Sequence, residues 1–330
     1  MTDTIPSLPG WLLELLIGLL VAPARLLLEP TSRSYWPYLA VSLAAAAWLR
    51  RQERRRGARL PPRLDVFSST TWLGRSAMND YWLVIVNTTM IGGLLAAIVQ
   101  EGPRLAAAVA AGLHALLPSP ALGTGPALAV ALAATLFVVD DLVRYLLHRV
   151  EHAVPALWAL HKVHHSAEAL NFVTAERHHP LSLLVYAVGI GSAAALVNGA
   201  CLWACAEPVA PSTLLGANAF WLLGNLLGSS LRHSPAWLSF GPRVERWLLS
   251  PAQHQLHHSE DPRHFGCNLG GTLAVWDRLF GTLLVTTHER VPLTFGLGPE
   301  TASYRSLPAL YLEPLRRIAH RPTGGDLRSS

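Results

Sequence analysis

Charged residues are scarce in this chain: Asp, Glu, Lys and Arg make up 14% of its 330 residues, against about 25% in an average soluble domain. Hydrophobic residues make up 51% and the mean hydropathy is +0.31, so the long apolar runs predict an integral membrane protein. Lys162 is the single lysine, and no basic stretch alternates with aromatic residues. The net charge of +5 is concentrated in one arginine-rich loop, which indicates membrane topology and argues against a nucleic-acid partner.

Cysteine is also rare. Cys201, Cys205 and Cys267 form neither a C-x-x-C pair nor an even framework, which argues against a disulfide scaffold and a zinc ribbon. The sequence lacks a G-x-G-x-x-G segment, a cysteine-rich iron–sulfur pattern and the His-Pro-Gly-Gly segment of a fused cytochrome b5 domain. If the chain is a redox enzyme, its electrons are therefore expected to come from a separate protein. No cleavable signal peptide is predicted, because Glu14 interrupts the first apolar run.

Apolar runs predict where the chain crosses the membrane. About 20 apolar residues, at about 1.5 Å each, cross a hydrocarbon core of about 30 Å. The runs at 11–28 and 36–49 are weak or short, and the run at 104–117 is expected to be an interfacial or re-entrant helix, ended by Pro118 and Pro120. Clear spans are expected at 81–99, 126–147, 181–205 and 212–231.

Histidine is abundant where charge is scarce. Most of the 15 histidines lie between His148 and His258, in blocks that read H-x-x-x-H, H-x-x-H-H and again H-x-x-H-H. Helical residues three or four positions apart lie on one face, so each block projects its imidazoles together. Buried imidazoles need partners, and a metal ion satisfies several of them at once. The eight imidazoles of these blocks exceed the usual ligand set of one ion, which predicts two metal ions.

Topology gives an independent expectation for these blocks. If the arginine-rich loop at 50–63 is cytosolic, the four clear spans return both the first block and His233 to the cytosolic face. The fold class is therefore predicted as all-α: an integral, multi-pass membrane bundle, in a bacterial inner membrane, with a cytosolic helical cap carrying a His-rich dimetal site. The predicted parts are N-terminal membrane helices over 1–125, a catalytic domain over 126–285, and a peripheral segment with a disordered tail over 286–330.

Six separated sequence elements resemble the fatty acid hydroxylase and sterol desaturase superfamily. The elements are D-x-x-x-Y-x-x-H-R-x-x-H (Asp141 to His152), H-x-x-H-H-S (His161 to Ser166), Asn171 with R-x-H-P (Arg177 to Pro180), H-S (His233, Ser234), S-P-x-x-H-x-x-H-H-S (Ser250 to Ser259) and W-D-R-L-F-G-T (Trp276 to Thr282). Carried over by motif, the implied metal ligands are His148, His152, His161, His164, His165, His179, His233, His254, His257 and His258.

Other residues of these motifs are candidates for supporting the ligands, namely Asp141, Tyr145, Asn171 and Asp277, while His178 and His264 are left uncertain. Asp141 either accepts the second N–H of a ligand imidazole or forms a helix-end ion pair with Arg144 or Arg149. The role of Glu151 is open in the same way.

The resemblance implies a membrane-bound, non-haem di-iron oxygenase. Such an enzyme uses O2 and external electrons to hydroxylate or desaturate a lipid, which would be a fatty acyl chain, a sterol or a related molecule. Iron follows from the resemblance alone, because imidazole also binds zinc and copper, and zinc is an alternative occupant in isolated protein. The implied electron donor is a separate protein of the cytochrome b5, ferredoxin or reductase type.

Two other functions remain open from the sequence. The segment from His148 to His152 also reads H-x-x-E-H, the motif of an inverted zinc peptidase with Glu151 as general base. That reading leaves both H-x-x-H-H blocks without a role. A non-enzymatic metal transporter would instead hold its ligands near the middle of the bilayer, whereas these histidines follow the ends of the predicted spans.

Overall fold

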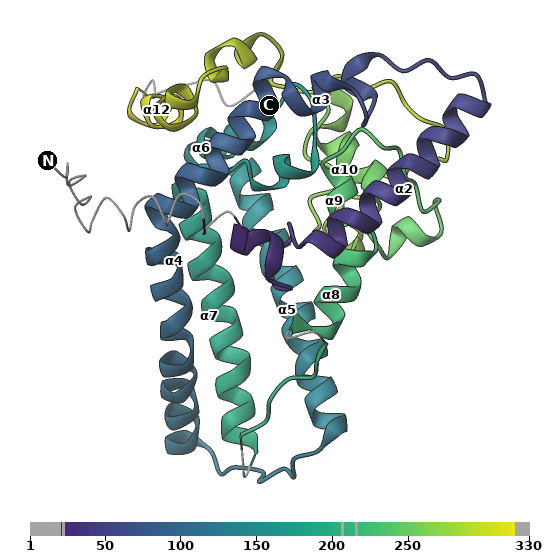
Figure 1. The fold of residues 1–330 in the computed structure, drawn as a ribbon. Helices are drawn as coiled ribbons and strands as arrows, with labels where there is room; N and C mark the ends of the chain where they lie inside the picture. The colour runs from purple at the N-terminus through teal and green to yellow at the C-terminus, as the bar shows by residue number, and fades with distance from the viewer. Residues whose placement is uncertain (1–20, 22–23, 206–207, 215–216, 321–330) are drawn as a thin grey trace, which may run out of the picture.

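The computed structural model describes residues 21, 24–205, 208–214 and 217–320, and this part of the chain is mostly helical. Three long helices form a stalk, one short helix lies beside it, and the other helices gather at one end of it as a head (Figure 1). The stalk consists of α4 (Arg75–Leu116), α5 (Pro126–Ala153) and α7 (Pro180–Ala204), each long and apolar enough to cross a membrane. Few of their residues are buried inside the protein, which suits helices that face lipid. The predicted helical membrane bundle is therefore confirmed.

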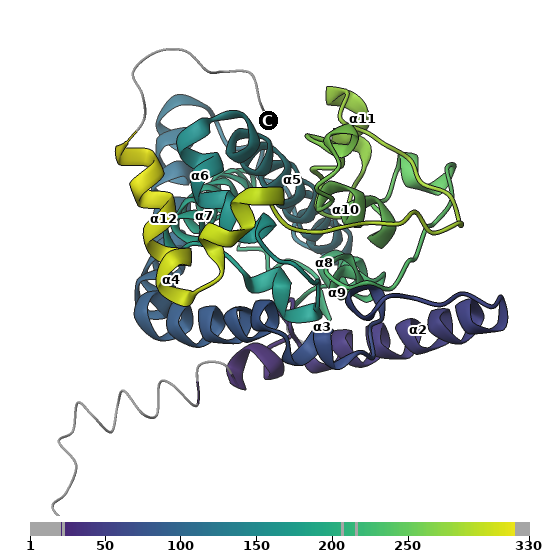
Figure 2. The ribbon, with the colours of Figure 1, turned by 90° about the horizontal axis from the view of Figure 1, so that it is seen from above.

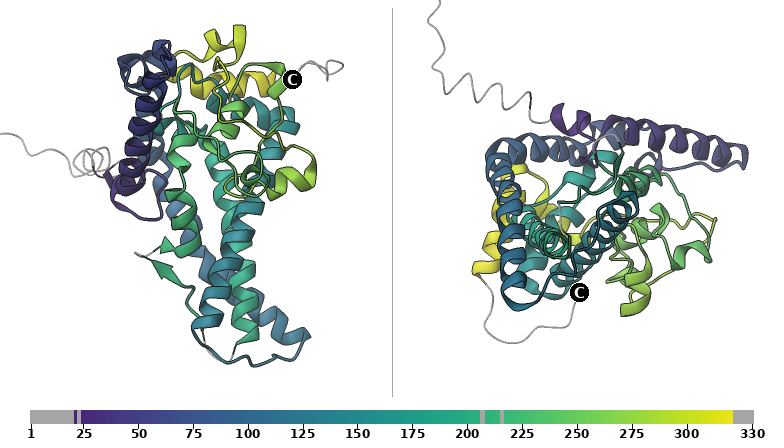
Figure 3. Two further views of the ribbon diagram at one scale, coloured as in Figure 1. Left: turned by 90° about the vertical axis from the view of Figure 1, so that its right-hand side faces the viewer. Right: turned by 90° about the horizontal axis from the view of Figure 1, so that it is seen from below.

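The head is built from short helices that approach the stalk from several directions. Figure 2 shows α10 and α11 on one side of the stalk end and α12 on the other, with α2 along one edge, and Figure 3 shows the stalk narrowing below the head. The α-helices of the head are α2 (Trp36–Arg55), α3 (Ser69–Leu73), α6 (Pro155–His165), α9 (Ser229–Arg232), α10 (Pro251–His257), α11 (Val275–Phe280) and α12 (Leu307–Ala319). Its 3-10 turns are η1 (Pro62–Leu64), η2 (Phe172–Glu176), η3 (Val244–Arg246), η4 (Pro262–His264) and η5 (Gly298–Tyr304).

Helices α4 and α7 pack closely along the stalk because small residues line their contact. Ala106 and Ala110 of α4 are buried, as are Ala195 and Gly199 of α7. A Cβ added at Gly199 would lie 2.7 Å from the carbonyl oxygen of Ala106 and 2.6 Å from the Cβ of Val109, closer than atoms can pack. Glycine at this position therefore permits the approach of the two helices.

Replacing Gly199 with valine is expected to separate α4 from α7 and to lower the thermal stability of the protein in detergent by several degrees. Overpacking a tight contact destabilises by about 1–3 kcal/mol. Thermal unfolding followed by tryptophan fluorescence measures the effect. Gly191, also in α7, has open space around its Cβ position and gives the matched control. Equal melting temperatures for the two valine variants would show that the contact does not limit stability.

The expectation of a separate interfacial helix at 104–117 is wrong, because this run continues the span at 81–99 within the single helix α4. Pro103 lies inside that helix. Proline removes one helical hydrogen bond, yet α4 continues past it to Leu116. The ion pair between Arg104 and Glu101, 2.9 Å apart, adds a local contact across the same turn.

The expected span at 212–231 is also wrong. This segment forms a small hairpin of β1 (Thr213–Leu214) and β2 (Ala217–Asn218), then the eight-residue α8 (Ala219–Leu226), then α9. The chain runs along α5 toward the head, and Asn218 Nδ2 donates to the carbonyl oxygen of Ala133 in α5 at 2.8 Å. Asn218 then caps α8 by accepting from the N–H groups of Phe220 and Trp221. The chain still returns to the head, so the histidine blocks share one end of the stalk.

Other expected segments have mixed outcomes. The arginine-rich residues 50–55 continue α2 as helix and do not form a loop, and Arg50 pairs with Asp65. Most of the weak apolar run at 11–28 and all of the expected disordered tail after Arg321 lie outside the described residues.

Candidate metal centre

The junction between α5 and α6 brings the first two histidine blocks together. Val154 adopts an extended backbone because the residue before a proline avoids the helical region, so α5 ends and Pro155 starts α6 in a new direction. The third block lies on α10, whose start is fixed by a capping box between Ser250 and Gln253. His233 follows α9. The imidazoles of α5, α6, α10 and the residue after α9 thus lie in one place.

Nine of the ten expected ligands gather in two adjacent groups. Group A contains His148, His152, His161, His165 and His257, and group B contains His164, His233, His254 and His258. In each group the nitrogens that face one another all lie within 4.8 Å. Imidazole nitrogens bind zinc at about 2.0–2.1 Å, so two ligands of one ion are at most about 4.2 Å apart. Both groups are close to the dimensions of a metal site.

Helix geometry explains how the histidines divide. Each residue turns the helix by about 100°, so a step of four ends about 40° past a full turn and a step of three about 60° short of it. His161 and His165 therefore point to group A, and His164 points to group B. In α10 the same division occurs with the groups exchanged. Each H-x-x-H-H block thus contributes to both groups and links them.

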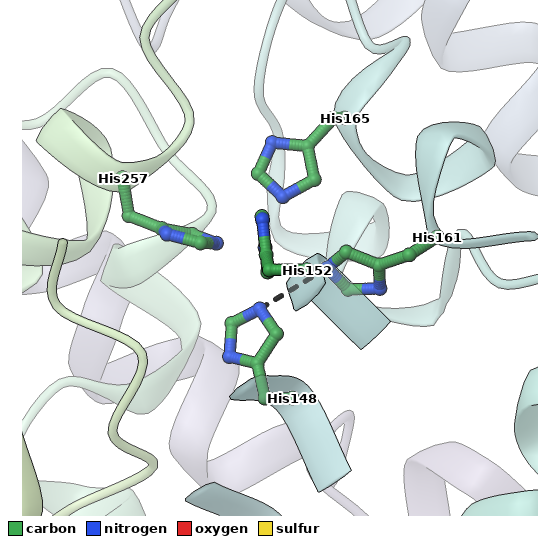
Figure 4. A group of neighbouring side chains, drawn as sticks. All are labelled: His148, His152, His161, His165 and His257. Carbon is green, nitrogen blue, oxygen red and sulfur yellow. Dashed lines mark hydrogen bonds between the residues drawn. The ribbon is translucent and has the colours of Figure 1, made fainter. Parts of the chain in front are cut away.

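The imidazoles of group A converge on a common point (Figure 4). His148 Nε2 lies 3.1 Å from His161 Nε2. The Nε2 atoms of His152, His165 and His257 are buried and have no hydrogen-bond partner among the described residues. Buried nitrogens without partners are unfavourable, and a metal ion among them would satisfy all of them together. The donor set therefore fits a metal ion.

Group B shows the same convergence. The Nε2 atoms form a series of short separations, 3.1 Å from His164 to His233, 3.0 Å from His233 to His254 and 3.1 Å from His254 to His258. The Nδ1 atoms of His233 and His254 are buried without partners in the described chain. Four Nε2 atoms at these separations in a buried cluster are placed to donate their lone pairs to one shared metal ion.

Electrostatics keeps these imidazoles in the form that binds metal. Burial is the main cause, followed by nearby imidazoles and arginines, and together they hold the pKa of six histidines well below the ordinary value of 6.5: His164, His165, His233, His254, His257 and His258. Because their pKa values are low, these imidazoles are neutral at pH 7, as metal ligands must be.

Backbone carbonyls fix the orientation of two rings of group A. His148 Nδ1 donates to the carbonyl oxygen of Leu269 at 2.8 Å, and His257 Nδ1 donates to that of Cys267 at 2.9 Å. Asp277, at the start of α11, holds this loop by accepting from the N–H groups of Leu269 and Gly270 at 2.7 and 2.8 Å. Asp277 thus supports the two imidazoles through the loop and touches no imidazole of the two groups.

Glu151 orients a third ring. Its Oε2 lies 2.8 Å from His161 Nδ1 and accepts from the hydroxyl of Tyr186 at 3.1 Å. The Glu151 side chain is 2% exposed. A carboxylate on the far nitrogen of a ligand imidazole fixes its tautomer and raises its basicity. This arrangement gives Glu151 a defined role that its sequence position left open.

Asp141 does neither of the two things expected of it. Its carboxylate accepts from the backbone N–H groups of Thr272 and Leu273, at 2.6 and 3.0 Å, and from Trp276 Nε1 at 2.9 Å. The helix-end ion pair with Arg144 is made by Asp140 instead. Through Asp141, helix α5 therefore holds the loop whose backbone carbonyls orient His148 and His257.

Tyr145 and Asn171 also lie away from the imidazoles. The Tyr145 hydroxyl is 3.1 Å from Thr282 Oγ1, which in turn donates to Asp277. Asn171 caps η2 and donates to Asp80 Oδ2 at 3.2 Å. Both residues connect helices of the stalk to loops of the head, so they support the site indirectly, without contacting its imidazoles.

Asp80 is a residue that sequence reasoning missed. It is fully buried and accepts from Arg177 Nη1 at 2.7 Å and from Thr174 Oγ1 at 2.7 Å. Arg177 in turn donates to the carbonyl oxygen of Val163 and to Ser166 Oγ, which fixes the end of α6. The available signal was an acid at the head end of an apolar helix, which is rare without a partner.

His179 lies outside both groups, in contrast to the expectation. As the residue before Pro180 it has an extended backbone and caps α7, with Nδ1 accepting from the N–H of Leu181 at 3.2 Å. Its Nε2 lies 3.2 Å from the carbonyl oxygen of Tyr311. His178 stacks on His164 with ring centroids 4.6 Å apart, and His264 lies in η4, outside both groups.

Two cavities lie next to the histidines, and no histidine lines both of them. The first, about 320 Å³, is lined by His148, His161, His164, His233 and His254 together with residues of α5, α7 and α8. The second, about 370 Å³, is lined by His152, His165 and His257 together with head residues from Trp158 to Glu300. The centre is therefore accessible from two sides.

Comparison with known proteins agrees with this geometry. The fatty acid hydroxylase family model matches residues 133–282. Alkylglycerol monooxygenase of Xenopus tropicalis is 31% identical over 166 residues, which are 49% of this chain and 32% of that protein. Ornithine lipid hydroxylase OlsE of Rhizobium tropici and methylsterol monooxygenase 1 of Rattus norvegicus are each 29% identical over 44% of this chain, and over 39% and 44% of their own lengths.

The matched segment thus covers less than half of each of these relatives, and no solved structure matches the chain. The matched residues nevertheless include all nine histidines of groups A and B. Residues 133–282 therefore form a fatty acid hydroxylase domain, as the histidine motifs predicted.

Proposed function

We propose that this protein is a membrane-bound oxygenase that uses two metal ions and O2 to hydroxylate or desaturate a lipid. The observation that carries the proposal is the pair of buried, neutral imidazole groups at the head end of three helices able to cross a membrane. The named activities of the relatives, on alkylglycerol, ornithine lipid and methylsterol, all concern lipids and support the same class. Groups A and B are the proposed ligand sets.

The two metal ions would supply O2 binding and stepwise reduction between open coordination positions. The residues of the chain prepare that chemistry. Glu151 and the carbonyl oxygens of Leu269 and Cys267 hold three ligand rings in place, and burial keeps water from the imidazoles. The first cavity, which opens beside α5, α7 and α8, suits entry of an apolar substrate from the bilayer.

Hydroxylation breaks one C–H bond, places one oxygen atom of O2 on that carbon and releases the other as water, with two electrons and two protons supplied from outside. We propose a separate electron-donor protein of the cytochrome b5, ferredoxin or reductase type, docking on the side of the second cavity. Turnover of the purified chain with NAD(P)H alone would contradict a separate donor.

Iron is the proposed metal, because the family resemblance favours it and imidazole by itself does not discriminate. The proposed topology is multi-pass, in a bacterial inner membrane, with the head in the cytosol. Arginines at the end of α2 lie in that head and support a cytosolic orientation. Labelling of cysteines introduced at Arg243, in the head, and at Gly123, between α4 and α5, tests this topology. The cysteine at position 243 is expected to react only from the cytosolic side of the membrane, and the cysteine at position 123 only from the opposite side.

Metal analysis of the detergent-purified chain, paired with lipid analysis of cells with and without it, tests the proposed function. Two iron ions per chain and one oxidised lipid that depends on the chain are expected. Protein that binds no more than one ion when supplied with iron, or a lipid profile that does not change, would contradict the proposal.

Replacing Glu151 with glutamine is expected to weaken metal binding in group A by about 10–100-fold, because the carboxylate no longer orients and polarises His161. Competition with a chelator measures this. The inverted peptidase alternative makes the opposite prediction, namely unchanged metal content with no activity. It is not supported, since the carboxylate lies 2.8 Å from His161 Nδ1 and accepts from the Tyr186 hydroxyl. The transporter alternative is not supported either, because the histidines lie at the head end of the stalk.

A further inference from the structure

The first cavity combines the metal ligands with an unusual number of cations. Arg33, Arg144 and Arg232 all line it, beside five histidines of groups A and B. Arg33 precedes α2, Arg144 lies on α5 and Arg232 ends α9, so three separate segments bring their guanidinium groups to this cavity. These three guanidinium groups make the wall of the cavity strongly polar, although the cavity lies at the end of a membrane bundle.

Two of these arginines have unused hydrogen-bonding capacity. Arg144 is satisfied, because Nε and Nη2 donate to the two carboxylate oxygens of Asp140 at 2.7 and 3.1 Å. Arg232 Nε is buried without any partner, and Arg33 makes no hydrogen bond or ion pair with a described residue. A buried guanidinium N–H left unpaired is strongly unfavourable, so it marks a place for an acceptor.

The acidic groups of the cavity already accept hydrogen bonds. The Asp141 carboxylate receives three hydrogen bonds from the loop at 272–276, and Glu176 receives one from Ser34 Oγ at 3.1 Å. Two unpaired cations therefore face this space.

We infer that the first cavity binds the anionic oxygens of a lipid head, phosphate or carboxylate, through Arg33 and Arg232. The inference rests on the proposed function, since it takes this cavity as the substrate site. Guanidinium groups bind carboxylate and phosphate oxygens with short, charge-assisted hydrogen bonds. The acyl chains would extend from the cavity along the apolar surfaces of the stalk.

The position of oxidation follows from the same geometry. The cavity of about 320 Å³ is at the small end of the roughly 300–1,000 Å³ range of ligand pockets. It is therefore large enough for a head and the first carbons of a chain, and too small for a whole two-chain lipid. Because the arginines and His164, His233 and His254 line one small space, the oxidised carbon is expected to lie close to the head and not in the middle of the chain.

Lipid binding to the full, purified chain in neutral detergent tests the inference without requiring turnover. The probes are dioleoyl phosphatidate, oleate, the neutral dioleoylglycerol and inorganic phosphate. Phosphatidate and oleate are expected to bind at least tenfold more tightly than dioleoylglycerol, and R33Q and R232Q are each expected to weaken phosphatidate binding at least tenfold. R232K retains the charge without Nε and is expected to lose less. R243Q removes an exposed arginine of the head and is the matched control.

Equal affinity for phosphatidate and dioleoylglycerol, or unchanged affinity in folded R33Q and R232Q, would overturn the inference. Inorganic phosphate competing as well as phosphatidate would show a site for free phosphate and would overturn the lipid assignment. The metal content of the same samples reports separately on the proposed function. Arginine-dependent binding without bound metal would refute the oxygenase, and two ions without arginine-dependent binding would refute only the head site.

Discussion

Replacing His254 with alanine is expected to lower the bound metal from two ions per chain to one and to abolish lipid oxidation. His254 lies at the middle of group B, with its Nε2 3.0 Å from that of His233 and 3.1 Å from that of His258. Loss of a partner outside the ligands already weakens metal sites by about 10–100-fold, so loss of a ligand from a set of four is expected to exceed this range.

Elemental analysis and product formation measured on the same purified sample check this expectation. Two histidines serve as controls. His179 lies outside both groups and His288 is exposed, so their alanine variants are expected to keep both ions. A His179→Ala variant that loses one ion would instead make His179 a ligand, as its motif implied, and would show that the site rearranges on metal binding.

Replacing Asp80 with alanine is expected to destabilise the protein by about 3–5 kcal/mol, because it leaves the buried charge of Arg177 without a counter-ion. The two side chains are 0% and 1% exposed, so water does not replace the lost partner. Arg177 also fixes the last turn of α6, which carries His164 and His165, so weaker metal retention is expected together with the lower stability.

Thermal unfolding in detergent, with and without added metal, measures the Asp80 effect. Glu313→Ala removes one partner of the more exposed Arg317 and is expected to change stability by less than about 1 kcal/mol. If both variants melt at the same temperature, the buried pair does not contribute as proposed. Replacing Asp80 and Arg177 together by apolar residues is expected to recover part of the lost stability, because no buried charge then remains unpaired.

The sequence by itself determined the class of the protein. Three of the predicted spans correspond to the three stalk helices, because helix formation in lipid depends on length and hydropathy, which are local properties. The histidine spacing predicted a two-metal site for a similar reason. The angle between residues three or four apart on a helix is fixed, so H-x-x-H-H places three imidazoles on one side wherever the helix lies.

The sequence could not predict two of the segments near these spans. Residues 104–117 looked too short to cross and 212–231 looked long enough, yet the first continues α4 and the second is a hairpin followed by short helices. In both cases the structure of the segment depends on the helix packed against it. Helix α7 packs against residues 104–117 of α4, and α5 supplies hydrogen-bond acceptors to the segment at 212–231. Hydropathy of a segment contains no information about such partners.

Only the tertiary structure decided which histidines of different blocks come together in groups A and B and which residues orient them. Buried carboxylates perform different tasks, since Glu151 lies 2.8 Å from His161 Nδ1 whereas Asp141 and Asp277 hold a backbone loop. It also decided that Arg33 and Arg232, nearly 200 positions apart, face one cavity. Local spacing fixes what one helix can present, but the direction in which separate helices present it depends on packing between distant segments, which no short motif encodes.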